Sequence, residues 1–283
     1  MSSGHVQKIK QLPWVLWIRQ VQGIILFELR RSLTLRRSPF VYLLALAPLA
    51  LLSLRLFFPT EQEILDGIGG INVMFAIIFR AFYLRLAVFF GCVGVFMRLF
   101  RGDVLEKTLH YYFLTSVRRE ILVVGKYISG VLLNFIIFGG SVAVAFFLLY
   151  LPSGWVTVEE FVFKGPGMGH LFSYVGVTFL ACIGYGAVFL LMGLFFRNPI
   201  VPASVILGWE YINFLLPPYL KKISVIYYLE SLCPVPIPSG PVTILAEPAP
   251  FWLAVPGLLG LTLVVLVIAG LKIRQMEISY GEE

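Results

Sequence analysis

Three charged residues lie inside long apolar stretches of this sequence, where an ionised side chain is costly. Arg80 and Arg85 interrupt one stretch, and Glu210, flanked by Trp209 and Tyr211, interrupts another. A charge within a span costs about 2.5–3.5 kcal/mol on insertion scales and usually faces a bundle interior or a cavity. One interpretation is a polar patch along the path of a ligand. The other is an ion pair of Glu210 with Arg80 or Arg85 that only locks two helices, or arginines that reach the outer headgroups.

The residue patterns of common catalytic sites are absent from the sequence. It has three histidines, no HExxH zinc pattern and no GxSxG nucleophile turn. Gly125-Lys126 is followed by Tyr127 and lacks the upstream glycine of a phosphate-binding loop, so we expect no ATP hydrolysis by this chain. The three cysteines form no CxxC pair and are interpreted as small buried hydrophobic residues. We therefore predict no catalytic residue, no metal site and no bound cofactor.

The composition indicates that membrane-spanning helices position these charges. Of the 283 residues, 59% are hydrophobic and 13% are charged, whereas soluble domains are about half apolar and about a quarter charged. A hydrocarbon core is about 30 Å thick, and about 20 helical residues cross it. Six stretches meet this requirement, near residues 39–58, 76–99, 124–150, 171–196, 199–217 and 251–271. The predicted fold is an all-α polytopic membrane protein, with a six-span domain at 39–271 between a cytoplasmic N-terminal region (1–38) and a cytoplasmic tail (272–283).

The distribution of lysines and arginines predicts the orientation of these spans. If the N-terminus is cytoplasmic, the outer loops hold only Lys164, Lys221 and Lys222, and most other basic residues face the cytoplasm. An excess of Lys and Arg marks the cytoplasmic loops of membrane proteins. We therefore expect a multi-pass protein of the plasma (inner) membrane with both termini inside. The net charge of +7 is assigned to contact with the lipid bilayer and not to nucleic acid.

Residues 14–37 are predicted to form an amphipathic helix on the inner membrane surface. Apolar residues recur at helical spacing and form one stripe, namely Ile18, Val21, Ile25, Leu29 and Leu33. Tryptophans at the start of the segment suit the headgroup layer. The candidate polar residues of this connecting helix are Glu28, Arg30, Arg31, Arg36 and Arg37. The alternative is a plain basic anchor with no mechanical role.

The polar segment 100–123, between the second and third spans, is predicted to be a helix, a break and a second helix. Asp103 can cap a short helix, because Glu106 follows three residues later in the capping-box position. Thr115-Ser116 then breaks that helix, and the next one runs through Arg119 and Glu120 into the third span. Such a short, charged, rigid element suits docking to a soluble partner. Its aromatic residues have a second interpretation, an aromatic belt at the inner interface.

The outer loop 218–250 is long, rich in proline and unusually apolar. Its apolar run extends from Ile223 to Leu229, and several prolines follow Cys233. Unpaired backbone groups are not tolerated in lipid, so we expect short helices or a re-entrant segment packed on the outer mouth of the bundle.

The stretch Glu106 to Gly130, EKTLHYYFLTSVRREILVVGKYISG, resembles the loop after the second span in ABC exporter permeases of the ABC-2 type. The matching positions are Glu106, Thr108, Leu109, Leu114, Thr115, Arg118, Arg119, Glu120, Ile121, Gly125 and Lys126. The chain departs from the family where Lys107 replaces the usual glycine and where Val117 stands nearest the place of the turn proline. A second stretch, Phe27 to Leu52, is similar to the cytoplasmic connecting helix that leads into the first span of that family.

The resemblance implies a transmembrane subunit that couples ATP hydrolysis to the export of an unidentified substrate. It also implies two ATP-binding subunits, which would hold ATP and Mg²⁺, and a second permease copy or a paralogue. The first inner loop would then couple to the ATPase through Glu106, Thr108, Leu109, Tyr112, Phe113, Leu114, Thr115, Arg118, Arg119, Glu120 and Lys126. Two other classes stay open. One is a non-transporting membrane anchor or assembly factor on the same scaffold, and the other is a secondary transporter that would depend on Glu210.

Overall fold

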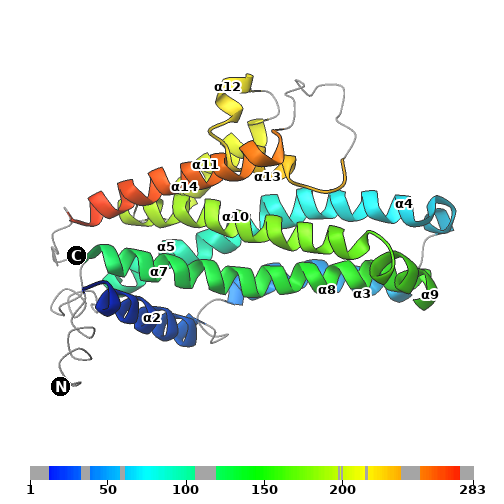
Figure 1. The fold of residues 1–283 in the computed structure, drawn as a ribbon, viewed down its shortest axis with the longest axis horizontal. Coiled ribbons are helices and arrows are strands. Elements are labelled where there is room, and N and C mark those ends of the chain that lie inside the picture. Colours follow the sequence, from blue (N-terminus) through cyan, green and yellow to red (C-terminus); the bar gives the residue numbers. More distant parts are fainter. Residues whose placement is uncertain are drawn as a thin grey trace, which may run out of the picture.

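The computed structural model describes residues 13–32, 39–57, 61–105, 119–196, 198, 200–213, 216–236 and 249–274. Every regular element in these ranges is a helix. The long helices run roughly parallel to one another along the longest dimension of the molecule (Figure 1). The all-α fold class predicted from the composition is therefore confirmed for the described ranges.

The helices follow one another along the chain as two long composite rods, two further long helices and several shorter ones. The elements are α2 (Pro13–Ser32), α3 (Pro39–Phe57), α4 (Glu61–Ile78), η1 (Phe79–Val88), α5 (Phe89–Leu105), α7 (Arg119–Asn134), η2 (Phe135–Gly139), α8 (Gly140–Tyr150), η3 (Leu151–Ser153), α9 (Trp155–Val158), η4 (Glu159–Phe163), α10 (Gly167–Phe195), α11 (Ile200–Ile212), α12 (Pro218–Lys221), α13 (Val225–Ser231) and α14 (Phe251–Arg274). The π-helix η1 joins α4 to α5, and the π-helix η2 joins α7 to α8, without a break in either rod.

Four helical stretches are long and apolar enough to cross a membrane, which indicates a membrane-embedded protein. They are Ile68–Leu99, Glu120–Ser153, Gly167–Phe195 and Phe251–Ile273. The first three have 32, 34 and 29 residues, so they are about 43–51 Å long at about 1.5 Å per residue. Because the hydrocarbon core is about 30 Å thick, these three helices extend beyond it or cross it at a tilt. Two other predicted spans coincide with shorter apolar helices, Pro39–Leu54 and Ile200–Ile212.

Two boundaries differ from those expected from hydropathy. Residues 61–75, which lie before the predicted second span, are helical, and α5 continues to Leu105. The predicted capping position, Asp103, therefore lies inside α5. Adding one residue to an existing helix is much easier than nucleating a new helix, so a growing helix passes through single polar residues. Helix α7 begins at Arg119, while residues 106–118, which include the predicted break at Thr115-Ser116, lie outside the described part of the chain.

Helix α10 forms the centre of the bundle. It packs against α5, α7, α8 and α14, and its Tyr185 and Phe189 meet Phe89 of α5 with ring centroids 5.3 and 5.0 Å apart. A Cβ atom on Gly186 would lie 2.6 Å from the Phe96 ring. The absence of a side chain at this glycine therefore allows α10 to approach α5 closely, as small residues do in membrane bundles.

Three helices are joined by a buried polar contact around Ser141. The Ser141 hydroxyl donates to the carbonyl of Ala45 in α3 at 2.6 Å, and it lies 2.9 Å from the Tyr83 hydroxyl of η1. Polar groups in an apolar bundle are stable only when they find such partners. This contact fixes α3 and η1 against α8.

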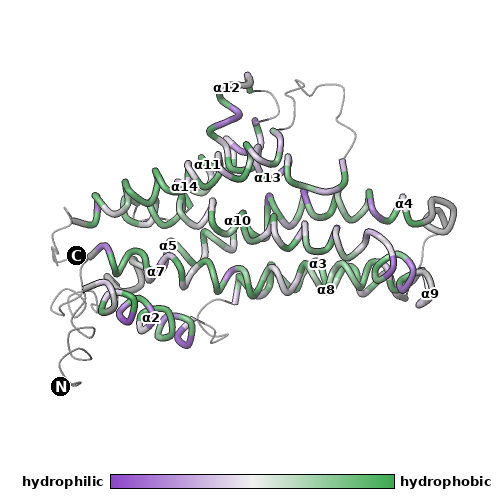
Figure 2. Tube along the Cα trace, viewed as in Figure 1, coloured by the Kyte–Doolittle hydropathy of each residue, from purple (hydrophilic) through white to green (hydrophobic). Residues whose placement is uncertain are grey.

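The apolar surface is concentrated on the long helices. Figure 2 shows them mostly in the hydrophobic colour, with hydrophilic positions on α2 and α12. On α14, nine large apolar side chains are exposed, namely Phe251, Trp252, Leu253, Leu259, Leu263, Val264, Val267, Ile268 and Leu271. Such a contiguous surface is unfavourable in water and suits contact with lipid or with another helix.

Candidate functional site

A buried ion pair joins the connecting helix to the third predicted span. The Lys126 ammonium of α7 lies 2.8 Å from Glu28 Oε1 of α2. It also donates to the carbonyl oxygen of Leu99 in α5 at 2.6 Å. The side chains of Lys126 and Glu28 are 0% and 5% exposed. The two contacts of Lys126 bring α2, α5 and α7 together at one point.

The fit between α2 and α7 depends on a glycine beside the ion pair. A Cβ atom on Gly125 would lie 2.9 Å from the Cγ2 atom of Ile24, closer than side chains normally approach. Without that atom, α2 lies directly against the first part of α7 and runs alongside it (Figure 1). The Gly125-Lys126 pair of the sequence therefore has two structural roles, since the glycine allows the close approach and the lysine supplies the ion pair.

The buried face of α2 overlaps the predicted apolar stripe in part. Leu29 of the stripe is partly buried against the core, as is Ile24, and Glu28 is buried, whereas Ile18 of the stripe is 50% exposed. Other apolar side chains of α2 are also exposed, namely Trp14, Leu16, Leu26 and Phe27. The stripe was inferred from hydrophobicity alone, and that criterion assigns a glutamate to the solvent side. Burial of Glu28 becomes favourable only because Lys126 compensates its charge.

Only part of the predicted coupling set falls in the described ranges. Arg119 and Glu120 begin α7, and Glu120 is partly buried with partners. Lys126, about two turns further along α7, is buried against α2 and α5. The remaining members of the set, Glu106 to Arg118, lie outside the described residues, as do Arg36 and Arg37 of the connecting segment. Arg30 is exposed on α2, and Arg31 is partly buried with a partner.

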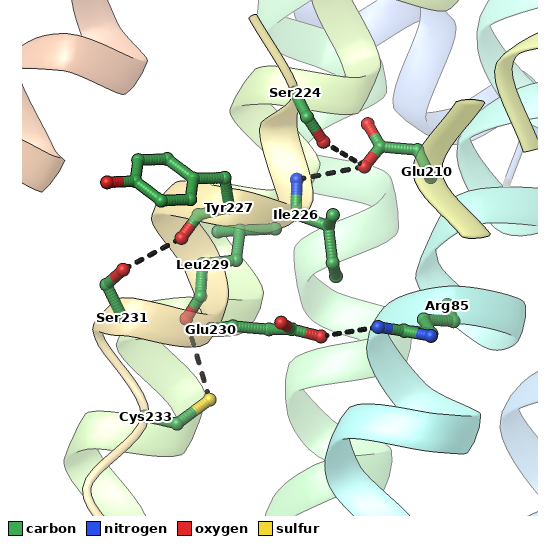
Figure 3. A network of polar contacts seen from close by, with 9 residues as sticks. All are labelled: Arg85, Glu210, Ser224, Ile226, Tyr227, Leu229, Glu230, Ser231 and Cys233. Carbon is green, nitrogen blue, oxygen red and sulfur yellow. Dashed lines mark hydrogen bonds and ion pairs between the residues drawn. The ribbon is translucent and has the colours of Figure 1, made fainter. Parts of the chain in front are cut away.

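A second polar cluster surrounds the short helix α13 in the predicted outer loop (Figure 3). The Arg85 guanidinium lies 2.8 Å from Glu230 Oε1, and the two side chains are 26% and 34% exposed. Arg85 also lies over the ring of Tyr211, with its Cζ atom 5.4 Å from the ring centroid. The nearby Arg80 donates to the carbonyl oxygen of Val235 at 3.0 Å. Both arginines of the second predicted span therefore contact the segment that contains α13.

The carboxylate of Glu210 holds the other end of α13. It accepts hydrogen bonds from the Ser224 hydroxyl at 2.5 Å and from the backbone N–H groups of Val225 and Ile226 at 3.2 Å each. The two N–H groups belong to the first turn of α13, where backbone donors have no partner within the helix and a negative charge is favoured. The predicted ion pair of Glu210 with Arg80 or Arg85 is therefore not formed among the described residues. Glu210 instead fixes α11 to α13.

The π-helix explains why both arginines reach the same segment. In an α-helix, residues five apart differ by about 140° in direction, because each residue turns the helix by about 100°. In a π-helix the hydrogen bonds join residues five apart, so such residues lie on the same side of the helix. Arg80 and Arg85 are both within η1. The wider turn therefore presents both guanidinium groups to α13 and the residues that follow it.

The sequence indicated the short helices of this region but not their polar partners. Short helices were one of the two forms expected for the loop 218–250, and α12 and α13 are found there. Glu230 was not recognised as a functional residue, because it lies 145 residues from Arg85 along the chain and follows an apolar run. The signal in the sequence that could have indicated Glu230 is its position, a carboxylate directly after the apolar run that ends at Leu229.

Comparisons with known proteins leave the chain without an assigned family. No protein-family model, curated protein or solved structure matches it.

Proposed function

We propose that this chain is the transmembrane subunit of an ABC exporter, driven by ATPase subunits that bind its cytoplasmic side. In this proposal the chain crosses the membrane six times, with α3 and α11 as the two short crossings, and both termini are cytoplasmic. The segment 106–118 contacts the ATPase, and a second permease copy or a paralogue completes the transporter. The proposal rests on the resemblance of Glu106 to Gly130 and on the contacts of Lys126.

The ion pair between Lys126 and Glu28 is the observation that carries this proposal. A soluble motor can move spans only through elements that are attached rigidly to them. Helix α7 begins immediately after the segment 106–118, and α2 is fixed to it by an ion pair that is almost fully buried. The carbonyl of Leu99 attaches the end of α5 to the same point. A displacement of the segment would therefore move three helices together, and the equilibrium shifts when the motor binds one arrangement better than the other.

The test is ATP turnover by the complex purified from native membranes with a tag on this chain. The double substitution Tyr112→Ala, Phe113→Ala should remove the co-purifying ATPase activity while the protein stays folded in the membrane. The control is Tyr219→Ala, which truncates a tyrosine that is 83% exposed on α12, in the predicted outer loop. Unchanged ATP turnover in the double variant, or equal loss in the control, would argue against docking at this segment.

Cysteine labelling tests the proposed orientation independently. A cysteine introduced at Glu106 should react with an impermeant maleimide only in inverted vesicles, and one introduced at Trp155, which is 68% exposed, should react in intact cells. The opposite pattern would exclude the proposed topology. If ATPase co-purifies but no substrate moves with ATP, the chain is an anchor and not a transporter.

A further inference from the structure

An apolar groove lies between α7, α10 and α14, which pack against one another. Its volume is about 400 Å³, within the range of sites that hold small molecules. The groove is formed by the second half of α7 and by the middle of α10 and of α14, with walls that include Val131, Leu132, Phe179, Ile183, Leu263 and Leu266. All three helices belong to stretches that are long and apolar enough to cross a membrane. In a bilayer the groove therefore opens onto the hydrocarbon core.

Among the described residues, the walls of the groove offer neither a charge nor an accessible hydroxyl group to a ligand. Tyr127 and Thr262 carry the two hydroxyl groups of the lining residues, and the other lining side chains are hydrocarbons. The Tyr127 hydroxyl donates to the carbonyl oxygen of Ile183 at 2.9 Å, and the Thr262 hydroxyl oxygen is buried. Apolar cavities of this kind stay free of water. The chemistry of the walls therefore requires an apolar occupant.

The groove is too small to hold a transmembrane helix of a second copy. One turn of an α-helix is about 10 Å wide with its side chains and about 5.4 Å high, so a single turn fills about 400 Å³. A helix that crosses the membrane has about 20 residues, which make more than about five turns. A lipid tail is much narrower than a helix, and lipid tails are the solvent at this depth of the bilayer.

We propose that the groove binds one acyl chain of a phospholipid from the surrounding bilayer. Lipid tails are as apolar as leucine, so the transfer of a tail from lipid to the groove gains little hydrophobic free energy. The gain comes from van der Waals contact along three helices, because an empty groove leaves its wall atoms without partners. The ring of Phe179 packs edge-on against Phe135 with the centroids 5.0 Å apart, which fixes the shape of one wall. The inference does not depend on the exporter function, because an anchor and a transporter would hold the chain in the same way.

Binding can be measured on the purified full chain by native mass spectrometry, without ATPase or transport. Bound lipid is first removed in digitonin, a detergent with a rigid steroid body that does not copy an acyl chain. The probes are dioleoylphosphatidylcholine, dioleoylphosphatidylglycerol and diphytanoylphosphatidylcholine, and the quantity compared is the affinity of the first lipid that binds. The two dioleoyl lipids should agree within about twofold, because the groove holds the tail, and the branched tails of the third should bind about threefold or more weakly.

Two substitutions fill the groove from opposite walls. Leu263→Trp on α14 and Leu132→Trp on α7 should each weaken the binding of dioleoylphosphatidylcholine by about tenfold or more. The matched control is Leu271→Trp, the same replacement on α14 at a leucine that is 54% exposed, against 64% for Leu263, and that does not line the groove. Its affinity should stay within about twofold of the unmodified protein. Because the two filling variants lie on different helices, misfolding of one leaves the other to test the site.

Thr262→Val tests whether the occupant is held by its apolar part alone. The two side chains have nearly the same shape, and the hydroxyl oxygen that is removed is buried. The affinity for dioleoylphosphatidylcholine should therefore stay within about twofold of the unmodified protein. A loss as large as that of Leu263→Trp would show that a polar group binds in the groove and would refute the acyl chain.

Three further results would overturn the proposal. Equal affinities in Leu263→Trp, Leu132→Trp and the control would remove the site. A preference of about tenfold or more for one dioleoyl lipid would place the contact at the headgroup. Crosslinking of Leu263→Cys between two chains by a short bismaleimide, together with absent lipid binding, would show that a second copy covers the groove. Failure of the ATPase experiment would leave these binding results intact, so the two proposals fail separately.

Discussion

The Lys126 ammonium lies 2.8 Å from the Glu28 carboxylate in an interface where the two side chains are 0% and 5% exposed. Removing two charges from solvent costs several kcal/mol per ion, and their attraction compensates only when both are present. The pair therefore adds little net stability beyond an apolar contact of the same shape. Its effect is to make α2 and α7 depend on each other.

Lys126→Met should destabilise the protein by about 3–5 kcal/mol, because Glu28 is left charged and buried. The double variant Lys126→Met, Glu28→Leu should recover most of that loss, since no uncompensated charge remains. Thermal unfolding in detergent measures both effects. Additive losses in the double variant would show that the two side chains do not interact.

Gly125→Ala should destabilise the contact between α2 and α7 by about 1–3 kcal/mol, because its Cβ atom would press on Ile24. The matched control is Gly140→Ala in the same rod, where no atom lies within 4 Å of the added Cβ. The control should gain up to about 1 kcal/mol from the higher helix propensity of alanine. Equal melting temperatures for the two variants would contradict the close approach.

The charge reversals Arg85→Glu and Glu230→Arg should each impair the protein, and the two together should restore it. The side chains are 26% and 34% exposed, so we expect a coupling free energy of only about 1 kcal/mol. A double-mutant cycle on thermal stability gives this value. Glu210→Arg should not rescue Arg85→Glu, because Glu210 contacts the start of α13 and not Arg85. Rescue by Glu210→Arg would reverse this assignment.

Alkylation of Cys233 should depend strongly on pH. Burial raises the pKa of its thiol to about 11, and the reactive form is the thiolate. The thiolate fraction should therefore grow about tenfold per pH unit between pH 7 and pH 10, where an ordinary thiol of pKa about 8.5 approaches a plateau. The nearby positive charge of Arg80 lowers this pKa, so Arg80→Gln should slow the reaction further. A rate plateau below pH 9.5 would contradict the burial of Cys233.

The sequence predicted the helical class and the charged residues that matter, but not how those residues pair. Arg85, Glu210 and Lys126 stand out locally, because each is a charge in an apolar segment. Their partners depend on chain segments far apart, 98 residues for Lys126 with Glu28 and 145 residues for Arg85 with Glu230. No local pattern encodes such contacts. The π-helix η1 could not be predicted from the sequence either, because the hydrophobic periodicity of its ten residues does not distinguish a π-helix from an α-helix.

Helix lengths were underestimated for a related reason. Hydropathy marks where a chain can contact lipid, whereas a helix continues for as long as its backbone hydrogen bonds are made. The helical residues 61–75 include Glu61, Glu63 and Asp66, which lower the hydropathy. A hydropathy criterion therefore places the start of the span after this part of the helix.

The rod made of α4, η1 and α5 is held at two points, one near its C-terminal end and one near its middle. The Leu99 carbonyl accepts a hydrogen bond from Lys126 at the first point, and Arg85 forms an ion pair with Glu230 at the second, about 20 Å away along the axis. A rotation of the rod about its own axis would therefore displace α13, which packs against η1. The wider turn of η1 places Arg80 and Arg85 on the same side of the rod. Deleting one residue there would point one of the two arginines away from α13 and uncouple α13 from a rotation of the rod.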